Sequence, residues 1–184
     1  MPTEGLGLAE QALARMSGSG GERRTYILGR LAEVYSQVGQ LDRAWQTIMD
    51  AQSISERSAE HSWDAELHRI AGEILLVKGA DTGEVEALFF RQAIGTSRRP
   101  EAKSLELRAA LSLARMLIGQ GRSAEMRDLL APIYAWFTEG FETADLREAR
   151  AVLELESVGQ PVKLTHPWLE WADGTRCKDL CHFF

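Results

Sequence analysis

Residues 25–51 read TYILGRLAEVYSQVGQLDRAWQTIMDA, and this stretch decides the fold. Apolar residues recur in it at the i, i+3, i+4, i+7 spacing of an amphipathic helix, at Leu28, Leu31, Ala32 and Tyr35. Gly39 follows this run at the position where a helix-ending glycine with positive φ belongs. A second run begins directly after it, so the stretch predicts two helices joined by a glycine turn.

Two further stretches repeat this pattern. Residues 65–93 read AELHRIAGEILLVKGADTGEVEALFFRQA, and residues 107–133 read LRAALSLARMLIGQGRSAEMRDLLAPI. The three stretches align on their turn glycines, Gly39, Gly79 and Gly121. In each, a small residue lies seven positions before the turn and a larger one four before it; these are Ala32, Gly72 and Ala114, then Tyr35, Leu75 and Leu117. We expect the small residues to be buried where helices cross, and Gly39 and Gly121 to have positive φ.

Breaker residues divide the chain into helices. The expected helices are Leu6–Met16, Arg23–Val38, Leu41–Arg57, Ser62–Lys78, Gly83–Thr96, Glu101–Gly119, Ser123–Phe137 and Thr143–Glu156. Pro132 lies inside the seventh, which predicts a kink or a late start there. No sustained period-2 alternation and no Asn-Gly or Asp-Gly turn is present, so the predicted fold class is all-α.

The spacing resembles the tetratricopeptide repeat, a helix–turn–helix unit of about 34 residues. The first stretch matches the family pattern best, at Leu28, Leu31, Ala32, Tyr35, Gly39, Ala44, Ile48 and Ala51. The second matches at Gly72, Gly79, Phe90 and Ala93. It carries about two extra residues after the turn, and Glu86 replaces the expected small residue. The third matches at Leu113, Ala114, Leu117, Gly121 and Leu130, with Met126 and Ile133 where alanine is usual. The resemblance implies a right-handed superhelix of antiparallel helix pairs, with about three and a half repeats.

Some segments resemble one particular repeat region. They are AELHRIAGEILL, FFRQAI, AKSLELRAALSLARML and YAWFTEGFETADLREARAVLEL. They are similar to the repeat tail that closes large bacterial signalling proteins, in which a nucleotide-cyclase or transcription-factor-like head joins a regulatory ATPase. The resemblance implies a regulatory role, with the chain as a stand-alone relative or a fragment of that tail. The head's chemistry does not carry over, since no GxxxxGK[ST] is present and the pairs Gly5/Gly7 and Gly18/Gly20 lack the third glycine of a dinucleotide fingerprint.

Composition and charge argue against several classes of partner and location. The 184 residues carry a formal net charge of −6, and the only Arg doublets, Arg23-Arg24 and Arg98-Arg99, lack interleaved aromatics, so we expect no nucleic-acid partner. No apolar run approaches the roughly 18–20 residues of a membrane span, and the first ten residues lack a signal-peptide pattern. Both cysteines, Cys177 and Cys181, lie in the last eight residues, which favours a reducing cytoplasm over a disulfide framework.

No catalytic residue, cofactor or metal site is predicted. His61 and His68 lie seven residues apart without an HExxH motif, and His68 occupies a packing position of the second repeat. Near the C-terminus four residues carry zinc-ligating side chains, namely His166, Cys177, Cys181 and His182, but CxxxCH is not a well-attested zinc knuckle. A Cys177–Cys181 disulfide requires a non-helical tail and an oxidising compartment. An enzymatic function is therefore the least favoured hypothesis.

The polar residues of the first helices suggest a binding groove, because the first helix of each pair lines the concave face of a repeat superhelix. By register with the family pattern, this face presents Arg30, Glu33, Gln37, Glu66, Arg69, Glu73, Arg108, Ser112 and Arg115. A mixed polar surface suits an extended peptide or a helix, although plain solvation explains it too. The lysine and asparagine of some family members' carboxylate clamp are missing from these positions. Charge reversal at Arg69 and Arg115 is expected to abolish partner binding and leave helicity intact.

The leading functional hypothesis is a non-catalytic protein-interaction module with a protein or peptide partner. The alternative is a self-assembling structural module, a homo-oligomer formed through the apolar face of Leu6–Met16 or through the tail.

The sequence predicts a repeat domain at residues 1–156 and a different segment at residues 157–184. This tail holds Trp168, Trp171, Phe183 and Phe184, an aromatic content that is high for a disordered segment. Three interpretations remain open: an end without a selected role, a cap that packs on the array, or a recognition peptide for another chain.

Overall fold

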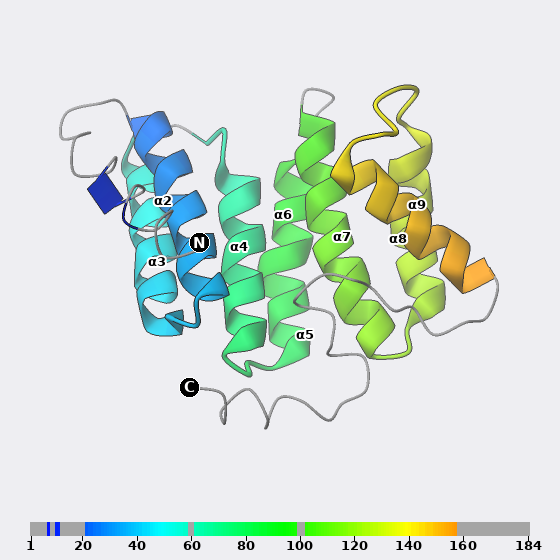
Figure 1. The fold of residues 1–184 in the computed structure, drawn as a ribbon, viewed down its shortest axis with the longest axis horizontal. Coiled ribbons are helices and arrows are strands. Elements are labelled where there is room, and N and C mark those ends of the chain that lie inside the picture. The colour runs from blue at the N-terminus through cyan, green and yellow to red at the C-terminus, as the bar shows by residue number, and fades with distance from the viewer. Residues whose placement is uncertain (1–6, 8–9, 12–20, 59–60, 99–101, 158–184) are drawn as a thin grey trace. The chain divides into compact units, whose positions relative to one another are not determined.

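The structure is a computed structural model, and it describes residues 7, 10–11, 21–58, 61–98 and 102–157. These residues are largely helical and contain no strand, which confirms the predicted all-α class (Figure 1). The chain divides into two compact units, Met1–Ser97 and Arg98–Phe184. We describe each unit by itself; the superhelix stays a prediction.

Unit 1 contains two helix pairs. The first is α2 (Gly21–Gln37) with α3 (Leu41–Ser58). The second is α4 (Asp64–Val77) with a helix built from α5 (Thr82–Val85), η1 (Glu86–Phe90) and α6 (Arg91–Thr96). Apolar faces of α2, α3 and α4 form a common core, with Leu31, Ile48 and Ile70 at its buried centre. Each expected helix of this unit, from Arg23 onward, is present within three residues of its expected ends.

A π-helical turn interrupts the last helix of unit 1. η1 lies between α5 and α6, and a π turn holds one residue more than an α turn. A second extra residue lies in the preceding turn, where Asp81 caps α5 by accepting a hydrogen bond from the Glu84 backbone N–H at 3.0 Å. Together they absorb the two additional residues of the second repeat and return Phe90 and Ala93 to the core, both fully buried.

This insertion corrects one assignment made from the sequence. Val85, 1% exposed, lies three residues into its helix, as Ala44 and Met126 do in theirs, so Val85 rather than Glu86 occupies the repeat's second-helix core position. Glu86 is the next residue along and pairs with Arg91, its Oε1 accepting from the Arg91 Nε at 2.9 Å.

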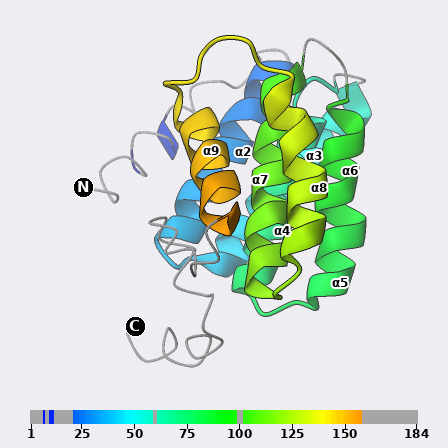
Figure 2. The same ribbon diagram turned by 90° about the vertical axis from the view of Figure 1, so that its right-hand side faces the viewer.

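Unit 2 contains α7 (Lys103–Gly119), α8 (Ser123–Ala135) and α9 (Ala144–Ser157), with α7 and α8 packed as a pair (Figure 2). Its core includes Leu113 of α7, Leu130 of α8 and Val152 of α9, each fully buried. Pro132 lies inside α8, and because that helix begins at Ser123, the alternative of a late start at the proline is wrong.

The turn glycines have the predicted conformation. Gly39, Gly79 and Gly121 have φ values of 77°, 82° and 70°. In each turn, the N–H of the residue that follows the glycine donates a hydrogen bond to the carbonyl of the residue four positions before the glycine. An example is the bond from Arg122 N to Leu117 O, at 2.8 Å. The larger residue that recurs four positions before each turn is therefore the residue whose carbonyl closes the helix.

The small residues are buried as predicted. Ala32 and Ala114 are fully buried, and Gly72 is buried in α4. A Cβ at Gly72 would lie 2.8 Å from Phe90 Cε1 and 3.0 Å from Phe89 Cβ, so α4 packs directly on the π turn. The small residues therefore allow close helix crossings.

Two predictions concern segments that are mostly undescribed. Of the expected helix Leu6–Met16, only Gly7, Glu10 and Gln11 are described, and these are helical. Its apolar face, and the tail from residue 158 onward, lie outside the described residues.

Candidate functional site: a polar helix face with a small aromatic pocket

The first helices of unit 1, α2 and α4, bring most of its predicted groove residues together. These are Arg30 and Glu33 from α2 and Glu66, Arg69 and Glu73 from α4. We call this group the ion-pair cluster. Gln37, near the end of α2, is exposed. The helical spacing places these side chains on one side of each helix, and the packing of α2 on α4 then joins the two rows.

Arg69 is the centre of the cluster. Its Nε and Nη2 donate to Glu66 Oε2 and Oε1, both at 2.9 Å, in the two-pronged geometry that guanidinium and carboxylate share. Its Nη1 lies 2.7 Å from Glu73 Oε2, and its Nη2 donates to Glu33 Oε1 at 3.2 Å. Arg69 and Glu66 are each only 4% exposed. Three carboxylates thus satisfy one buried guanidinium, and the contact with Glu33 ties α4 to α2.

The electrostatics favour a permanently charged Arg69. Burial by itself lowers the pKa of the guanidinium, because a low-dielectric surrounding disfavours the charged form. The carboxylates of Glu73, Glu66 and Glu33 outweigh this effect and hold the pKa of Arg69 well above its usual value. Arg69 therefore acts as a fixed structural charge and not as a proton donor.

Arg30 differs from Arg69 in its exposure. Its side chain is 45% exposed, while its Nη1 lies 2.6 Å from Glu33 Oε2 and 3.9 Å from Glu66 Oε1. The guanidinium is thus oriented by the cluster and still reaches solvent. Among the charged members of the predicted groove in unit 1, it is the one best placed to contact another molecule.

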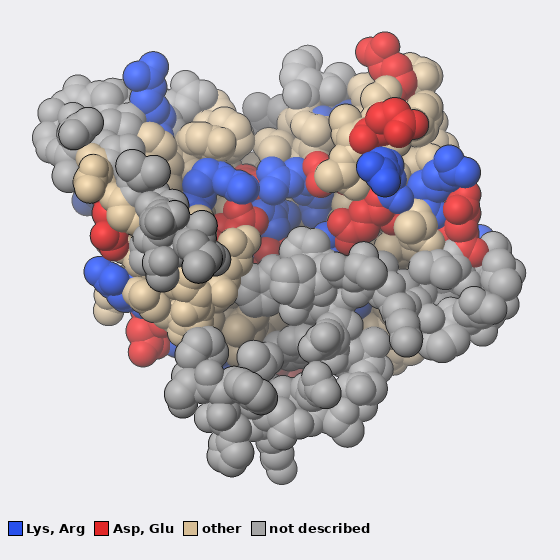
Figure 3. All heavy atoms as spheres, in the orientation of Figure 1, with Lys and Arg blue, Asp and Glu red and all other residues tan. Residues whose placement is uncertain are grey.

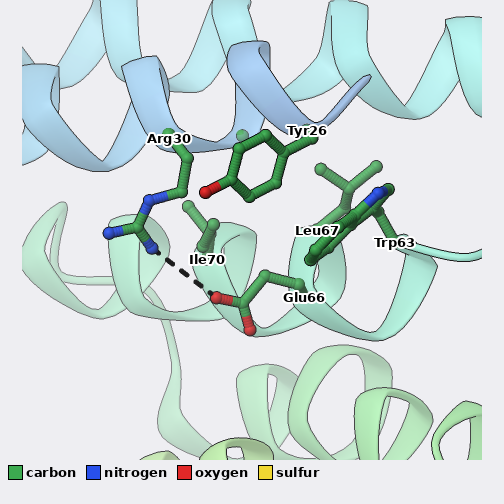
Figure 4. Close-up of a pocket in the computed structure, with 7 residues that line it drawn as sticks. Tyr26, Arg30, Trp63, Glu66, Leu67 and Ile70 are labelled. Atoms are coloured by element: carbon green, nitrogen blue, oxygen red, sulfur yellow. Dashed lines mark ion pairs between the residues drawn. The ribbon is translucent and has the colours of Figure 1, made fainter. Parts of the chain in front are cut away.

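A small pocket lies beside Arg30, and sequence reasoning missed it. Its lining residues are Tyr26, Gly29, Arg30, Trp63, Glu66, Leu67 and Ile70, and its empty volume is about 170 Å³, part of it open to solvent (Figure 4). The rings of Tyr26 and Trp63 lie with centroids 4.6 Å apart at a tilt of 44°. Tyr26 is 42% exposed. Figure 4 shows the two rings side by side, with Arg30 and Glu66 joined by their ion pair at the polar edge.

Local sequence explains how the pocket forms. Tyr26 lies one helical turn before Arg30 on α2, and Trp63 directly precedes α4 as its N-cap residue. Gly29 has no side chain to fill the space between them: a Cβ there would lie 3.1 Å from Leu67 Cδ2. The i, i+4 spacing of Tyr26 and Arg30 in the sequence could have indicated that the two side chains are neighbours on α2. The contribution of Trp63 could not be foreseen in this way, because it depends on how α2 packs on α4.

The predicted groove residues of unit 2 form pairs of their own. Arg115 of α7 donates from Nε and Nη2 to Glu148 of α9 at 2.8 and 2.7 Å. Arg108 Nε lies 3.8 Å from Asp145 Oδ2. Ser112, 4% exposed, donates from Oγ to the Arg108 carbonyl at 3.2 Å. These residues link α7 to α9 or turn inward, so none has the exposure of Arg30.

The described histidines bond to nearby residues of their own chain. The Nδ1 of His61 lies 2.8 Å from Asp64 Oδ2, and the Nδ1 of His68 lies 2.7 Å from the Asp64 carbonyl. Across the described ranges, no three His, Cys, Asp or Glu side chains are grouped as a metal site requires. His166, Cys177, Cys181 and His182 lie outside those ranges.

A search of the helices within the described ranges finds none whose length and apolar character suit it to cross a membrane. Comparisons with protein-family models, with curated proteins and with solved structures give no match for this chain. The resemblance to tetratricopeptide repeats therefore stays a prediction.

Proposed function

We propose that this chain is a non-catalytic protein-interaction module that binds an extended peptide or a helix across the face formed by α2 and α4. The observation that carries the proposal is the pocket in which Tyr26 and Trp63 stand beside the exposed guanidinium of Arg30. Trp, Tyr and Arg are the residue types that dominate binding energy at protein interfaces.

The size of the pocket favours a side chain as its occupant. Its empty volume of about 170 Å³ includes open solvent, so it is a shallow hollow and not an enclosed small-molecule site. Leu67 and Ile70 provide an apolar floor, and the Tyr26 and Trp63 rings provide a wall. In the proposed complex an apolar side chain of the partner packs over this hollow against the two rings, with the partner's polar groups directed toward Arg30 and Glu66.

The ion-pair cluster holds this surface ready for binding. Arg69 fixes Glu33, Glu66 and Glu73 in place, and Glu33 in turn orients Arg30. A surface that is ordered before binding loses less conformational entropy when the partner docks. The same contacts make Arg69 and Arg115 unsuitable as test positions. Reversing either charge sets like charges against each other in a buried or half-buried pair, which disturbs the fold as well as binding.

The extension of this surface to Arg108, Ser112 and Arg115 follows from the repeat resemblance and stays a prediction. The regulatory role, the bacterial signalling context and the cytoplasmic location have the same status.

The test uses the full chain to select peptides from a random display library. We expect selected peptides to carry an apolar anchor residue and to lose about tenfold or more in affinity against Tyr26→Ala and Arg30→Ala, the loss typical of interface hot spots. Met49→Ala is the matched control, because Met49 is also 42% exposed but lies on α3. Circular dichroism checks that each variant keeps its helices. Selected peptides that bind both pocket variants as tightly as the unchanged chain contradict the proposal.

A further inference from the structure

The connection between α8 and α9 exposes large aromatic side chains. Residues 134–142 read YAWFTEGFE, which places four aromatic residues within eight positions. Trp136 is 50% exposed and Phe141 is 39% exposed, well beyond what a core aromatic shows. We call the segment's aromatic and acidic side chains the aromatic–acidic patch: Tyr134, Trp136, Phe137, Glu139, Phe141 and Glu142.

The backbone holds these side chains in defined places. α8 ends at Ala135, and the Phe137 N–H donates to the Tyr134 carbonyl at 3.2 Å in the following turn. Gly140 has a φ of 76°, which reverses the chain, and its carbonyl accepts from the Thr143 N–H at 2.9 Å. The segment is thus a series of hydrogen-bonded turns.

The rings support one another in pairs. Tyr134 and Phe141 have centroids 5.8 Å apart at 60°, and Trp136 and Phe137 have centroids 5.2 Å apart at 85°. Both pairs are edge-to-face arrangements, which are favourable contacts between aromatic rings. The exposed rings are therefore ordered by their neighbours before any partner binds, which lowers the entropic cost of docking.

The charged residues of the segment itself are all acidic. From Asp128 to Leu146 the chain has four acidic residues and no Lys or Arg. Two of these, Glu139 and Glu142, are exposed within the patch itself. Figure 3 shows red acidic side chains at the upper right, in the region of the α8–α9 connection that Figure 1 draws in yellow, with blue Lys and Arg side chains below them. A partner that meets this surface gains from carrying positive charge.

One cation already contacts the patch from within the chain. The Nζ of Lys103 lies 5.7 Å from the centroid of Trp136, within the range of a cation–π interaction, while it also pairs with Glu106 Oε2 at 2.5 Å. The indole of Trp136 thus accepts an ammonium group on one side and remains half exposed. This contact shows the chemistry that the exposed part of the ring offers to a second cation.

We propose that the aromatic–acidic patch is a docking surface for a partner protein segment that carries Lys or Arg next to apolar side chains. The apolar side chains pack on the Trp136 and Phe141 rings, and the cations pair with Glu139 and Glu142 or stack on the indole. This surface belongs to unit 2 and is independent of the α2–α4 face, so each proposal stands or falls without the other.

The test measures binding of a synthetic amphipathic helix of Leu and Lys to the full chain by calorimetry. A peptide with Glu in place of Lys and a peptide with Gln in place of Leu serve as probes of charge and of apolar contact. We expect the Leu/Lys peptide to bind tightest and to weaken as salt screens the charges. We expect Trp136→Ala, and separately the double variant Glu139→Gln/Glu142→Gln, to weaken it about three- to tenfold.

Matched controls lie in unit 1. Leu88→Ala removes an apolar side chain of similar exposure, 53%, and Glu84→Gln removes an exposed carboxylate. These controls and Tyr26→Ala should bind the peptide like the unchanged chain, with the melting temperature checked for every variant. Equal weakening by the controls, or unchanged binding by both patch variants, overturns the proposal.

Two further outcomes assign the patch to another occupant and also overturn the proposal. Self-association of the full chain that Trp136→Ala abolishes, seen by sedimentation, assigns the patch to a second copy. Tighter peptide binding after Lys163, Arg176 and Lys178 are all changed to Gln assigns it to the chain's own C-terminal segment.

Discussion

Two glycines at the end of α7 differ in backbone conformation. Gly121 has a φ of 70°, a conformation that L side chains rarely adopt, while nothing within 4 Å would contact a Cβ added there. Gly119, two residues earlier, is the last residue of α7 and also has open space around a Cβ. The two positions therefore separate the cost of backbone conformation from that of crowding.

We predict that Gly121→Ala lowers the free energy of unfolding by about 1 kcal/mol, because alanine is strained at positive φ. Gly119→Ala should raise it by up to about 1 kcal/mol, since alanine is the better helix former. Urea unfolding followed by circular dichroism measures both. Changes of the same sign at the two positions would show that the α7 turn relaxes away from its left-handed conformation.

At the scale of the element, charged side chains connect helices that the sequence separates. Arg69 has 4% exposure and Glu66 the same, so their interaction is shielded from solvent. The Arg115–Glu148 pair has similar geometry, but its side chains are 16% and 23% exposed. Water screens the second pair more than the first, which makes the two pairs a natural comparison.

We predict that Arg69→Met destabilises the protein by about 3–5 kcal/mol, because the buried Glu66 carboxylate loses both hydrogen bonds from Arg69 and keeps the longer ion pair with Arg30. Arg115→Met should cost less, since Glu148 then gains water. The difference between their urea unfolding midpoints checks this. Similar losses for the two variants would mean that burial does not determine the strength of these pairs.

A second link between elements depends on pH. Asp42 lies in the first turn of α3, and Lys78 lies just beyond the end of α4. The Asp42 carboxylate accepts a hydrogen bond from Lys78 Nζ at 2.5 Å. The hydrogen bond and the charge of Lys78 lower the pKa of Asp42 from 3.8. A lowered pKa in the folded state means that the link stabilises the fold above about pH 3.8 and is lost as the pH falls through the folded value.

We predict that Asp42→Asn slightly lowers the melting temperature at pH 7 and that the difference from the unchanged chain shrinks below about pH 3.8. The effect is small, because the Asp42 side chain is 90% exposed. Thermal melts from pH 7 to pH 3 measure it, and Lys78→Met should give the same profile. A difference that persists unchanged at pH 3 would mean that Asp42 acts through something other than its charge.

At the scale of the whole molecule, the chain divides into two compact units. Gly72 lies in unit 1, and a Cβ there would lie 2.8 Å from Phe90 Cε1. Gly95 lies in the same unit with no atom within 4 Å of an added Cβ. Substitutions at these two glycines therefore perturb one unit to very different degrees.

We predict that Gly72→Ala destabilises unit 1 by about 1–3 kcal/mol through overpacking. Hydrogen exchange followed by mass spectrometry should then show faster amide exchange in α2 to α6 than in α7 to α9, because protection reports local stability. Gly95→Ala should not speed exchange in unit 1, since the added Cβ meets no atom and alanine is the better helix former. An equal increase across all helices would mean that the two units unfold as one.

Much of the fold was predictable because it rests on local preferences. The spacing of Leu28, Leu31 and Tyr35 predicted α2, and the turn glycines predicted where the helices end. The alignment on those glycines also predicted that Ala32, Gly72 and Ala114 are buried. For the site, the sequence placed Arg30 and Glu33 on one face of α2, and Glu66, Arg69 and Glu73 on one face of α4, since helical register alone decides which residues share a face. That this face binds a partner stays a prediction.

Other features depend on distances between helices and were decided by the tertiary structure. The π turn at Glu86–Phe90 arises because the core must receive Phe90 despite two extra residues, and no local preference signals it. Arg69 is enclosed by carboxylates from two helices, and the pocket needs Trp63 beside Tyr26. The sequence by itself determined which residues share a face of each helix, although Glu66, Arg69 and Ser112 of the predicted groove are buried. Only packing decided which of them meet, because contacts across helices depend on the approach of whole elements and not on spacing along the chain.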